Sequence, residues 1–263
     1  MTKRSAKRFL REGTLDAEQY QPDAKVRRLN VHNGGGYGGN VTPWSPMGAA
    51  GDDREQSYIK TIKPKSEGQA ELISAIDEKN LVLALGPAGT GKTYLAIAKA
   101  VEALEAGKVG RIVLSRPAVE AGESLGYLPG DMEDKLAPYL RPLYDALSDR
   151  LSMKRLKALM QEGLIEIAPV GYMRGRTLNN AFVVIDEAQN CTYTQLKMLL
   201  TRLGWNSTMI VTGDPNQSDL LPGLSGLADV ADRFEAVETI KVVRLKDKDI
   251  VRHPLVAQML GVL

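Results

Sequence analysis

The 263-residue sequence contains one cysteine, Cys191, and two histidines. A single cysteine cannot form an internal disulfide, which suits a reducing compartment. His253 has no surrounding cluster of His or Cys residues, so the sequence does not favour it as a metal ligand or a catalytic base. No apolar run approaches the roughly 18 residues of a transmembrane helix. Basic residues near the N-terminus are followed by no apolar core of the kind found in secretory signals, so we expect a cytoplasmic protein.

The chain also lacks a strong excess of charge of either sign. The formal net charge is +2, while 43% of the residues are hydrophobic and 25% are charged. These proportions are ordinary for a globular protein. Any surface that binds nucleic acid must therefore be local, because the molecule as a whole has little basic bias.

Residues 1–56 differ in composition from the rest. They begin as a basic, polar stretch and continue as a glycine-rich one, with Tyr37 and Trp44 nearby. Such a segment buries too little apolar surface to offset the entropy of ordering, so we expect it to be largely disordered on its own. A solvated tail is the favoured interpretation, and contact with RNA or a neighbouring subunit is the alternative. We expect residues 57–263 to form one folded domain.

The segment 86–93 matches the phosphate-loop pattern G-x-x-x-x-G-K-[ST] completely. The apolar run 81–85 before it predicts a buried strand, and helical spacing of apolar residues follows it as far as Gly107. Strand, glycine loop and helix together form a cradle for nucleotide phosphates. We expect Lys92 to contact the terminal phosphates and Thr93 to ligate Mg²⁺. The predicted phosphate-binding residues are Gly86, Pro87, Ala88, Gly89, Thr90, Gly91, Lys92 and Thr93.

Further apolar runs predict strands at 111–115, 165–170, 182–186, 209–214 and 240–245. Helical patterns lie between them, notably at 143–162 and 194–203, and another passes through Leu72, Ile73 and Ile76. This alternation predicts an α/β fold with a central, mostly parallel sheet and helices on both faces. The stretch 118–140 is irregular in pattern and predicts an insertion at the strand ends, with Tyr127 and Tyr139 as candidate nucleic-acid contacts.

Two of the predicted strands end in chemically useful side chains. The run 182–185 is followed by Asp186 and Glu187, which we expect beside the phosphate loop. Asp186 would hold Mg²⁺, directly or through water, and Glu187 would act as general base on the attacking water. Two exposed acids at a strand end are the alternative interpretation. The run ending at Asp214 continues to Gln217, a candidate contact for the γ-phosphate, although Asp-Pro-Asn is also good turn chemistry.

Other polar residues have less certain roles in the sequence. Gln69, ahead of the phosphate loop, offers a donor and an acceptor that suit the adenine edge, or it is a surface helix residue. Several arginines could stabilise transition-state charge or form ordinary surface ion pairs. They are Arg116, Arg174, Arg176 and Arg252.

The ordered set of motifs at 86–93, 116–117, 126–130, 173–176, 186–189, 213–217 and 251–254 resembles the PhoH-like ATPase family. The resemblance covers roughly residues 58–263. It implies a RecA-like P-loop NTPase core similar to one motor domain of superfamily 1 helicases. It also implies ATP hydrolysis with Mg²⁺ and a link to RNA metabolism and phosphate starvation.

Superfamily 1 helicases bind ATP between two RecA-like halves, and this chain has room for one. We therefore expect a homo-oligomeric ring, plausibly a hexamer, in which a neighbouring subunit supplies the missing arginine. Arg252 is the first candidate, followed by Arg174 or Arg176. The function expected is ATP hydrolysis coupled to remodelling of RNA or single-stranded nucleic acid. The alternatives are a nucleotide-gated oligomeric switch and a small-molecule phosphotransferase.

Overall fold

The structure is a computed structural model that describes residues 62–117 and 132–251, with the backbone alone for 132–137. The described residues belong to one compact unit. The expectations for residues 1–56, for Tyr127, and for Arg252 and His253 fall outside the described residues. In the described part of the chain, no helix has the length and apolarity needed to cross a bilayer.

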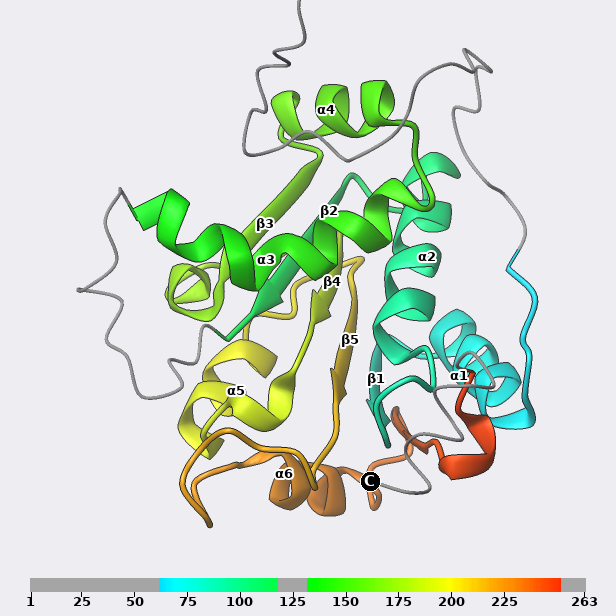
Figure 1. Ribbon diagram of the computed structural model, residues 1–263, viewed down its shortest axis with the longest axis vertical. Coiled ribbons are helices and arrows are strands. Elements are labelled where there is room, and N and C mark those ends of the chain that lie inside the picture. Colours follow the sequence, from blue (N-terminus) through cyan, green and yellow to red (C-terminus); the bar gives the residue numbers. More distant parts are fainter. Residues whose placement is uncertain (1–61, 118–131, 252–263) are drawn as a thin grey trace, which may run out of the picture. The chain divides into compact units, whose positions relative to one another are not determined.

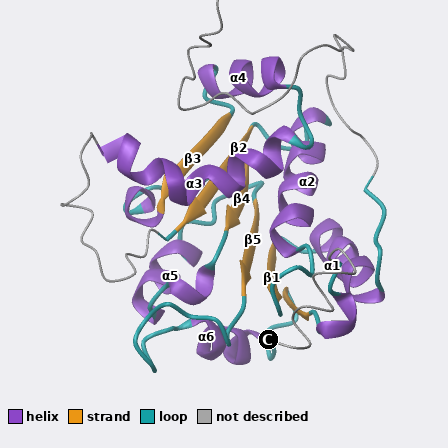
Figure 2. Cartoon of the chain, viewed as in Figure 1, coloured by secondary structure: helices purple, strands orange, loops and turns teal. Residues whose placement is uncertain are grey.

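Six parallel strands form the centre of the fold (Figures 1 and 2). Their order across the sheet is β3-β2-β4-β5-β1-β6. The fold class predicted from the sequence, α/β with a central, mostly parallel sheet and helices on both faces, is confirmed. The strands are β1 (Leu81–Leu85), β2 (Arg111–Arg116), β3 (Ile165–Pro169), β4 (Ala181–Ile185), β5 (Thr208–Gly213) and β6 (Ile240–Arg244).

Helices cover both faces of the sheet because the strands are apolar on both sides. Side chains of one strand alternate between two cores: Val82 and Ala84 pack in one, and Leu81 and Leu83 in the other. The first core is closed by helices α1 to α4, and the second by α5 and α6. These helices are α1 (Glu67–Glu78), α2 (Lys92–Glu105), α3 (Met132–Ser148), α4 (Met153–Gln161), α5 (Tyr193–Leu200) and α6 (Leu227–Phe234).

The prediction of an irregular stretch at 118–140 was wrong for its last part, because α3 begins at Met132. Pro138 and Pro142 lie inside this helix. An interior proline costs about 3 kcal/mol relative to alanine. Burial of apolar side chains such as Leu143 and Leu147 against the sheet offsets that cost.

The prediction of a single helix at 143–162 was also wrong. This segment contains the end of α3 and a separate helix, α4. Helix α3 ends at Ser148, and Ser152 is the N-cap of α4. The Ser152 hydroxyl accepts a hydrogen bond from Arg155 N–H and so caps α4. The helix predicted at 194–203 is α5, which ends at Leu200, and α6 was not among the predicted helices. The other strand boundaries shift by one residue or less, and β1 matches its prediction.

The strand order decides which loops meet. Strand β5 lies between β1, which leads into the phosphate loop, and β4, which leads into the two acids. All three run in the same direction, so their carboxyl ends share one edge of the sheet. In open α/β sheets ligands bind at this edge, and the candidate site is built here.

Candidate active site

The glycine loop connects β1 to α2 through backbone conformations that require glycine. Gly86 has a φ of 140°, and a Cβ there would lie 2.4 Å from the carbonyl oxygen of Leu245. Gly91, the N-cap of α2, has a φ of 86° and no side chain to cap the helix. A helix N-terminus without a side-chain cap can present its first N–H groups to an anion.

Lys92 places its ammonium group at this loop. The side chain is mostly buried, and its Nζ donates hydrogen bonds to the carbonyl oxygens of Gly86, at 2.6 Å, and Pro87, at 2.8 Å. Thr90 Oγ1 donates to the same Pro87 carbonyl, at 2.9 Å. The loop thus holds a cation in the cleft, at a position suited to phosphate oxygens.

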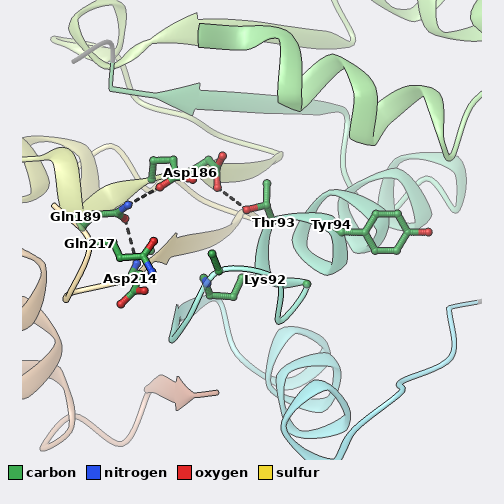
Figure 3. Close-up of a pocket in the computed structure, with 12 residues that line it drawn as sticks. Lys92, Thr93, Tyr94, Asp186, Gln189, Asp214 and Gln217 are labelled. Atoms are coloured by element: carbon green, nitrogen blue, oxygen red, sulfur yellow. Dashed lines mark hydrogen bonds between the residues drawn. The ribbon is translucent and has the colours of Figure 1, made fainter. Parts of the chain in front are cut away.

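Asp186, which directly follows β4, is joined to the phosphate loop. Its buried carboxylate accepts hydrogen bonds through Oδ1 from Thr93 Oγ1, at 2.6 Å, and from Thr212 Oγ1, at 2.7 Å (Figure 3). Its backbone N–H donates to Ser115 O at 2.8 Å, which fixes the chain at the end of the strand. Three strands, β2, β4 and β5, therefore position one carboxylate against the first turn of α2.

Glu187 turns away from the strand with a left-handed backbone, φ 51°, which is uncommon for a residue with a side chain. Its half-buried carboxylate accepts a hydrogen bond from Gln189 Nε2. Arg116, the last residue of β2, lies between the two acids: its guanidinium is 3.5 Å from Asp186 Oδ2 and 3.8 Å from Glu187 Oε1. One cation and one amide thus orient the glutamate beside the phosphate loop.

Gln189 and Asn190, in the short 3-10 turn η3 (Ala188–Asn190), tie the acids to the loop after β5. Gln189 is 3% exposed, and its Oε1 accepts the N–H of Asp214 at 3.1 Å. Asn190 and Asp219 exchange two hydrogen bonds of 2.8 Å, and Ser218 Oγ donates to Gln189 O. The two loops therefore form one interlocked unit.

A cleft of about 260 Å³ lies among these groups, lined by the glycine loop, both acids, Gln189, Asp214 and Gln217. Gln217 is exposed at its edge, where it could reach a terminal phosphate. Asp214 is buried, and its Oδ1 accepts the N–H of Asn216, while Gln217 N–H bonds back to Asp214 O. The motif at 214–217 therefore forms a turn and also lines the cleft, so its two interpretations are compatible.

Thr93 and Asp186 suit a Mg²⁺ ion. A hydroxyl and a carboxylate oxygen lie 2.6 Å apart at the mouth of the phosphate loop. Both are hard oxygen ligands, and Mg²⁺ is usually held by one or two such groups together with water and substrate phosphates. Thr93 and Asp186 are therefore the residues that would hold the ion.

Gln69 lies under the phosphate loop, with both heteroatoms of its amide in hydrogen bonds to the backbone. Nε2 donates to Thr90 O at 2.9 Å, and Oε1 accepts the N–H of Lys65 at 2.8 Å. The side chain is 5% exposed. Of its two sequence interpretations, the exposed helix residue is wrong, and the role of the amide in base binding stays a prediction.

The candidate arginines differ in their surroundings. Arg176 forms a two-pronged pair with Glu166 of β3, at 2.5 and 2.6 Å, and this pairing lowers the pKa of the Glu166 carboxyl. Arg174 is exposed. Arg252 lies outside the described residues, but its neighbour Val251 donates its N–H to Gly89 O of the phosphate loop at 2.9 Å.

Two contributions to the site were missed by sequence reasoning. The motif containing Gln189 was recognised, but the link from Gln189 to Asp214 depends on β5 lying beside β4, which no local pattern reports. Thr212, whose hydroxyl also bonds to Asp186, occupies an ordinary position near the end of an apolar strand. A polar residue at the buried end of such a strand was the available signal.

Solved structures with a partial likeness include the large terminase of a thermophilic bacteriophage, with a TM-score of 0.48 at 12% identity over 76% of this chain and 50% of that one. Another is the Sulfolobus solfataricus SWI2/SNF2 ATPase core in complex with dsDNA, with a TM-score of 0.45 at 15% identity over 74% and 47%.

Curated relatives are much closer in sequence. A PhoH-like protein of Bacillus subtilis (strain 168) is 55% identical over 76% of this chain and 63% of its own length. Protein PhoH of Escherichia coli (strain K12) is 43% identical over 96% of this chain and 69% of its own. The chain thus spans less than two thirds of some relatives. The family model described as PhoH-like protein matches residues 61–263, and the chain therefore belongs to the PhoH-like family.

Proposed function

We propose that this protein is a cytoplasmic, Mg²⁺-dependent ATPase. The observation that carries the proposal is the 2.6 Å hydrogen bond between Thr93 Oγ1 and Asp186 Oδ1. It joins the first turn after the phosphate loop to the acid at the end of β4, across the intervening strand β5. A phosphate cradle and a carboxylate in contact through a hydroxyl are what Mg²⁺-dependent phosphoryl transfer requires.

Several side chains of the cleft have roles in this reaction. Lys92 and the N–H groups of the glycine loop bind the phosphates of ATP. Glu187 accepts the proton of the attacking water, and Gln217 contacts the γ-phosphate or that water. Thr93 and Asp186 would hold Mg²⁺, which would offset the negative charge of the phosphates. Gln189 and Arg116 support the proposal because they orient the carboxylate of Glu187.

We further propose a homo-oligomeric ring, plausibly a hexamer, in which a neighbouring subunit completes the site with an arginine. Arg252 remains the first candidate, and the exposed Arg174 is favoured over Arg176, because Arg176 is already engaged by Glu166. Mixing Lys92→Ala subunits with Arg252→Ala subunits tests this arrangement. Recovered ATPase activity is expected, and a fully active monomer in sedimentation would rule it out.

The proposed purpose of hydrolysis is remodelling of RNA or single-stranded nucleic acid. Family resemblance supports this and extends it to phosphate starvation. Two alternatives are a nucleotide-gated switch with negligible turnover and a phosphotransferase acting on a small metabolite. Glu187 favours hydrolysis over both, because a carboxylate beside the phosphate loop suits activation of water.

Steady-state release of inorganic phosphate tests the proposal. Wild type, Lys92→Ala and Lys154→Ala are compared with ATP and Mg²⁺, with and without single-stranded RNA, single-stranded DNA and duplex. Lys154 is an exposed residue of α4, remote from the cleft, and serves as the matched control. We expect Lys92→Ala to lose about 100-fold in rate and Lys154→Ala to lose none. An unchanged rate in Lys92→Ala would contradict ATP hydrolysis at this site.

A further inference from the structure

A second cavity, of about 600 Å³, lies beside the phosphate loop. It shares Gly89, Gly91 and Tyr94 with the phosphate cleft, so the two are neighbouring parts of one surface that meets at the glycine loop. In Figure 3 the ring of Tyr94 points away from the acids. A nucleotide whose phosphates occupy the first cleft would therefore place its base in this second cavity, which is large enough to hold one.

The one side-chain amide that lines this cavity is engaged by the protein itself, among the residues that the structure describes. Gln69 donates from Nε2 to Thr90 O and accepts Lys65 N–H at Oε1, so its donor and its acceptor both face the backbone. Nε2 also lies close to Gly91, since a Cβ built there would be 3.1 Å from it. Gln69 thus braces the phosphate loop against the start of α1.

The rest of the described lining does not distinguish adenine from guanine. Ile62, Leu95 and Val251 are apolar, and the partly exposed ring of Tyr94 can stack on any base. Lys63 and Lys65 bring ammonium groups, which donate hydrogen bonds only. Both purines present N7 as an acceptor, and guanine adds O6.

We infer that this cavity binds the base of either purine nucleotide, and that Gln69 is a positioning residue of the phosphate loop. The protein then uses GTP as well as ATP. This inference rests on the proposed nucleotide hydrolysis at the adjacent cleft. It differs from base reading by Gln69, which would favour ATP through a two-pronged contact to adenine.

Two measurements on the Mg²⁺ complexes of ATP, GTP and CTP test the inference. The first is the dissociation constant of each nucleotide, measured by competition with a fluorescent ATP analogue. The second is the rate at which each nucleotide is hydrolysed. We expect ATP and GTP to bind within about fivefold of each other, whereas a two-pronged amide–base contact would give about 5- to 150-fold preference. CTP should bind more weakly than both, because its single ring covers less of Tyr94 and of the apolar lining than a purine does. A larger preference for ATP, or equally tight binding of CTP, would overturn the inference. Purine binding without turnover would support it while refuting hydrolysis.

The Gln69→Ala variant separates the two roles of the amide. As a brace, Gln69 supports both nucleotides, so its loss should weaken ATP and GTP by the same factor and leave their ratio unchanged. A selective loss of ATP binding would show base reading and overturn the inference. Gln161→Ala, at the exposed end of α4, is the matched control and should bind as wild type does.

Tyr94 provides a second test that does not depend on the brace. The side chain is 40% exposed, so its replacement should leave the fold intact. Tyr94→Phe should retain the affinity for both purines, whereas Tyr94→Ala should lose about 5- to 150-fold for both, which is the range of one stacked base. Unchanged affinity in Tyr94→Ala would place the base elsewhere.

Discussion

Replacing Gln189 by glutamate removes one hydrogen bond and keeps the other. The variant carboxylate can still accept the N–H of Asp214, which Gln189 Oε1 accepts at 3.1 Å. It cannot donate to Glu187, and it brings a second negative charge beside that side chain. Gln189→Glu therefore tests the orientation of the general base while leaving the link to β5 in place.

The size of the effect follows from the freedom that Glu187 regains. Ordering a glutamate side chain costs about 1.5–2 kcal/mol. Loss of that orientation should lower kcat by about 10- to 30-fold at 1.4 kcal/mol per decade. The dissociation constant of ATP should change little, because the glycine loop and Lys92 are untouched. Unfolding by denaturant should show some loss of stability, because the new carboxylate is buried beside Glu187, although the buried N–H of Asp214 keeps its partner.

Gln189→Met and Gln195→Glu complete the design. The methionine variant leaves the Asp214 N–H unsatisfied, so it should lose both kcat and about 1–3 kcal/mol of stability. Gln195→Glu makes the same chemical change in the capping box of α5 and should keep wild-type kcat. The reasoning is refuted if Gln189→Glu retains wild-type kcat, or if its whole loss appears in ATP affinity.

Three further outcomes follow from the site and its supports. Thr93→Ala should raise the Mg²⁺ concentration needed for half-maximal ATPase activity, while Thr93→Ser, which keeps the hydroxyl, should need the same concentration as wild type. Equal Mg²⁺ titrations for all three proteins would exclude Thr93 as a ligand. Gly86→Ala should lower the midpoint of urea unfolding, because its Cβ would overlap the carbonyl oxygen of Leu245; an unchanged midpoint would contradict the backbone described here. The backbone N–H of Lys246 is the main cause that lowers the pKa of Asp249, and other donors at the start of α1 lower it further. The ionised Asp249 carboxylate therefore stabilises the fold fully above the pKa that it has in the unfolded chain. This stabilisation is lost as the pH falls through the pKa of the folded state. The stability difference between wild type and Asp249→Ala should therefore be constant near neutral pH and shrink below about pH 4; a difference that grew on acidification would be inconsistent with this.

Local pattern was sufficient for the elements that carry the nucleotide chemistry. The apolar run of β1, the glycine spacing and the helical repeat of α2 occupy consecutive residues, so strand, loop and helix could be predicted together. Asp186 and Glu187 were placed correctly at a strand end, because a buried parallel strand is a continuous apolar run. The catalytic roles given to these residues stay predictions until the experiments are done.

Contacts between distant segments could not be predicted in the same way. Asp249 accepts the N–H of Gly68, 181 residues earlier in the chain, and no periodicity encodes such a pairing. The engagement of Arg176 by Glu166 likewise depends on how the chain returns from β3 towards β4. The first part of α3 was not predicted as helix, because it contains prolines, which local propensity disfavours in a helix. Tertiary packing overrides that propensity here.

We propose that Glu187 activates the water that attacks ATP bound at the phosphate loop. Single-turnover hydrolysis of ATP with Mg²⁺ by wild type and Glu187→Gln, with ATP affinity measured on the same samples, tests it most directly. We predict that the variant binds ATP as wild type does and hydrolyses it at least about 100-fold more slowly. Hydrolysis at the wild-type rate by Glu187→Gln would contradict it.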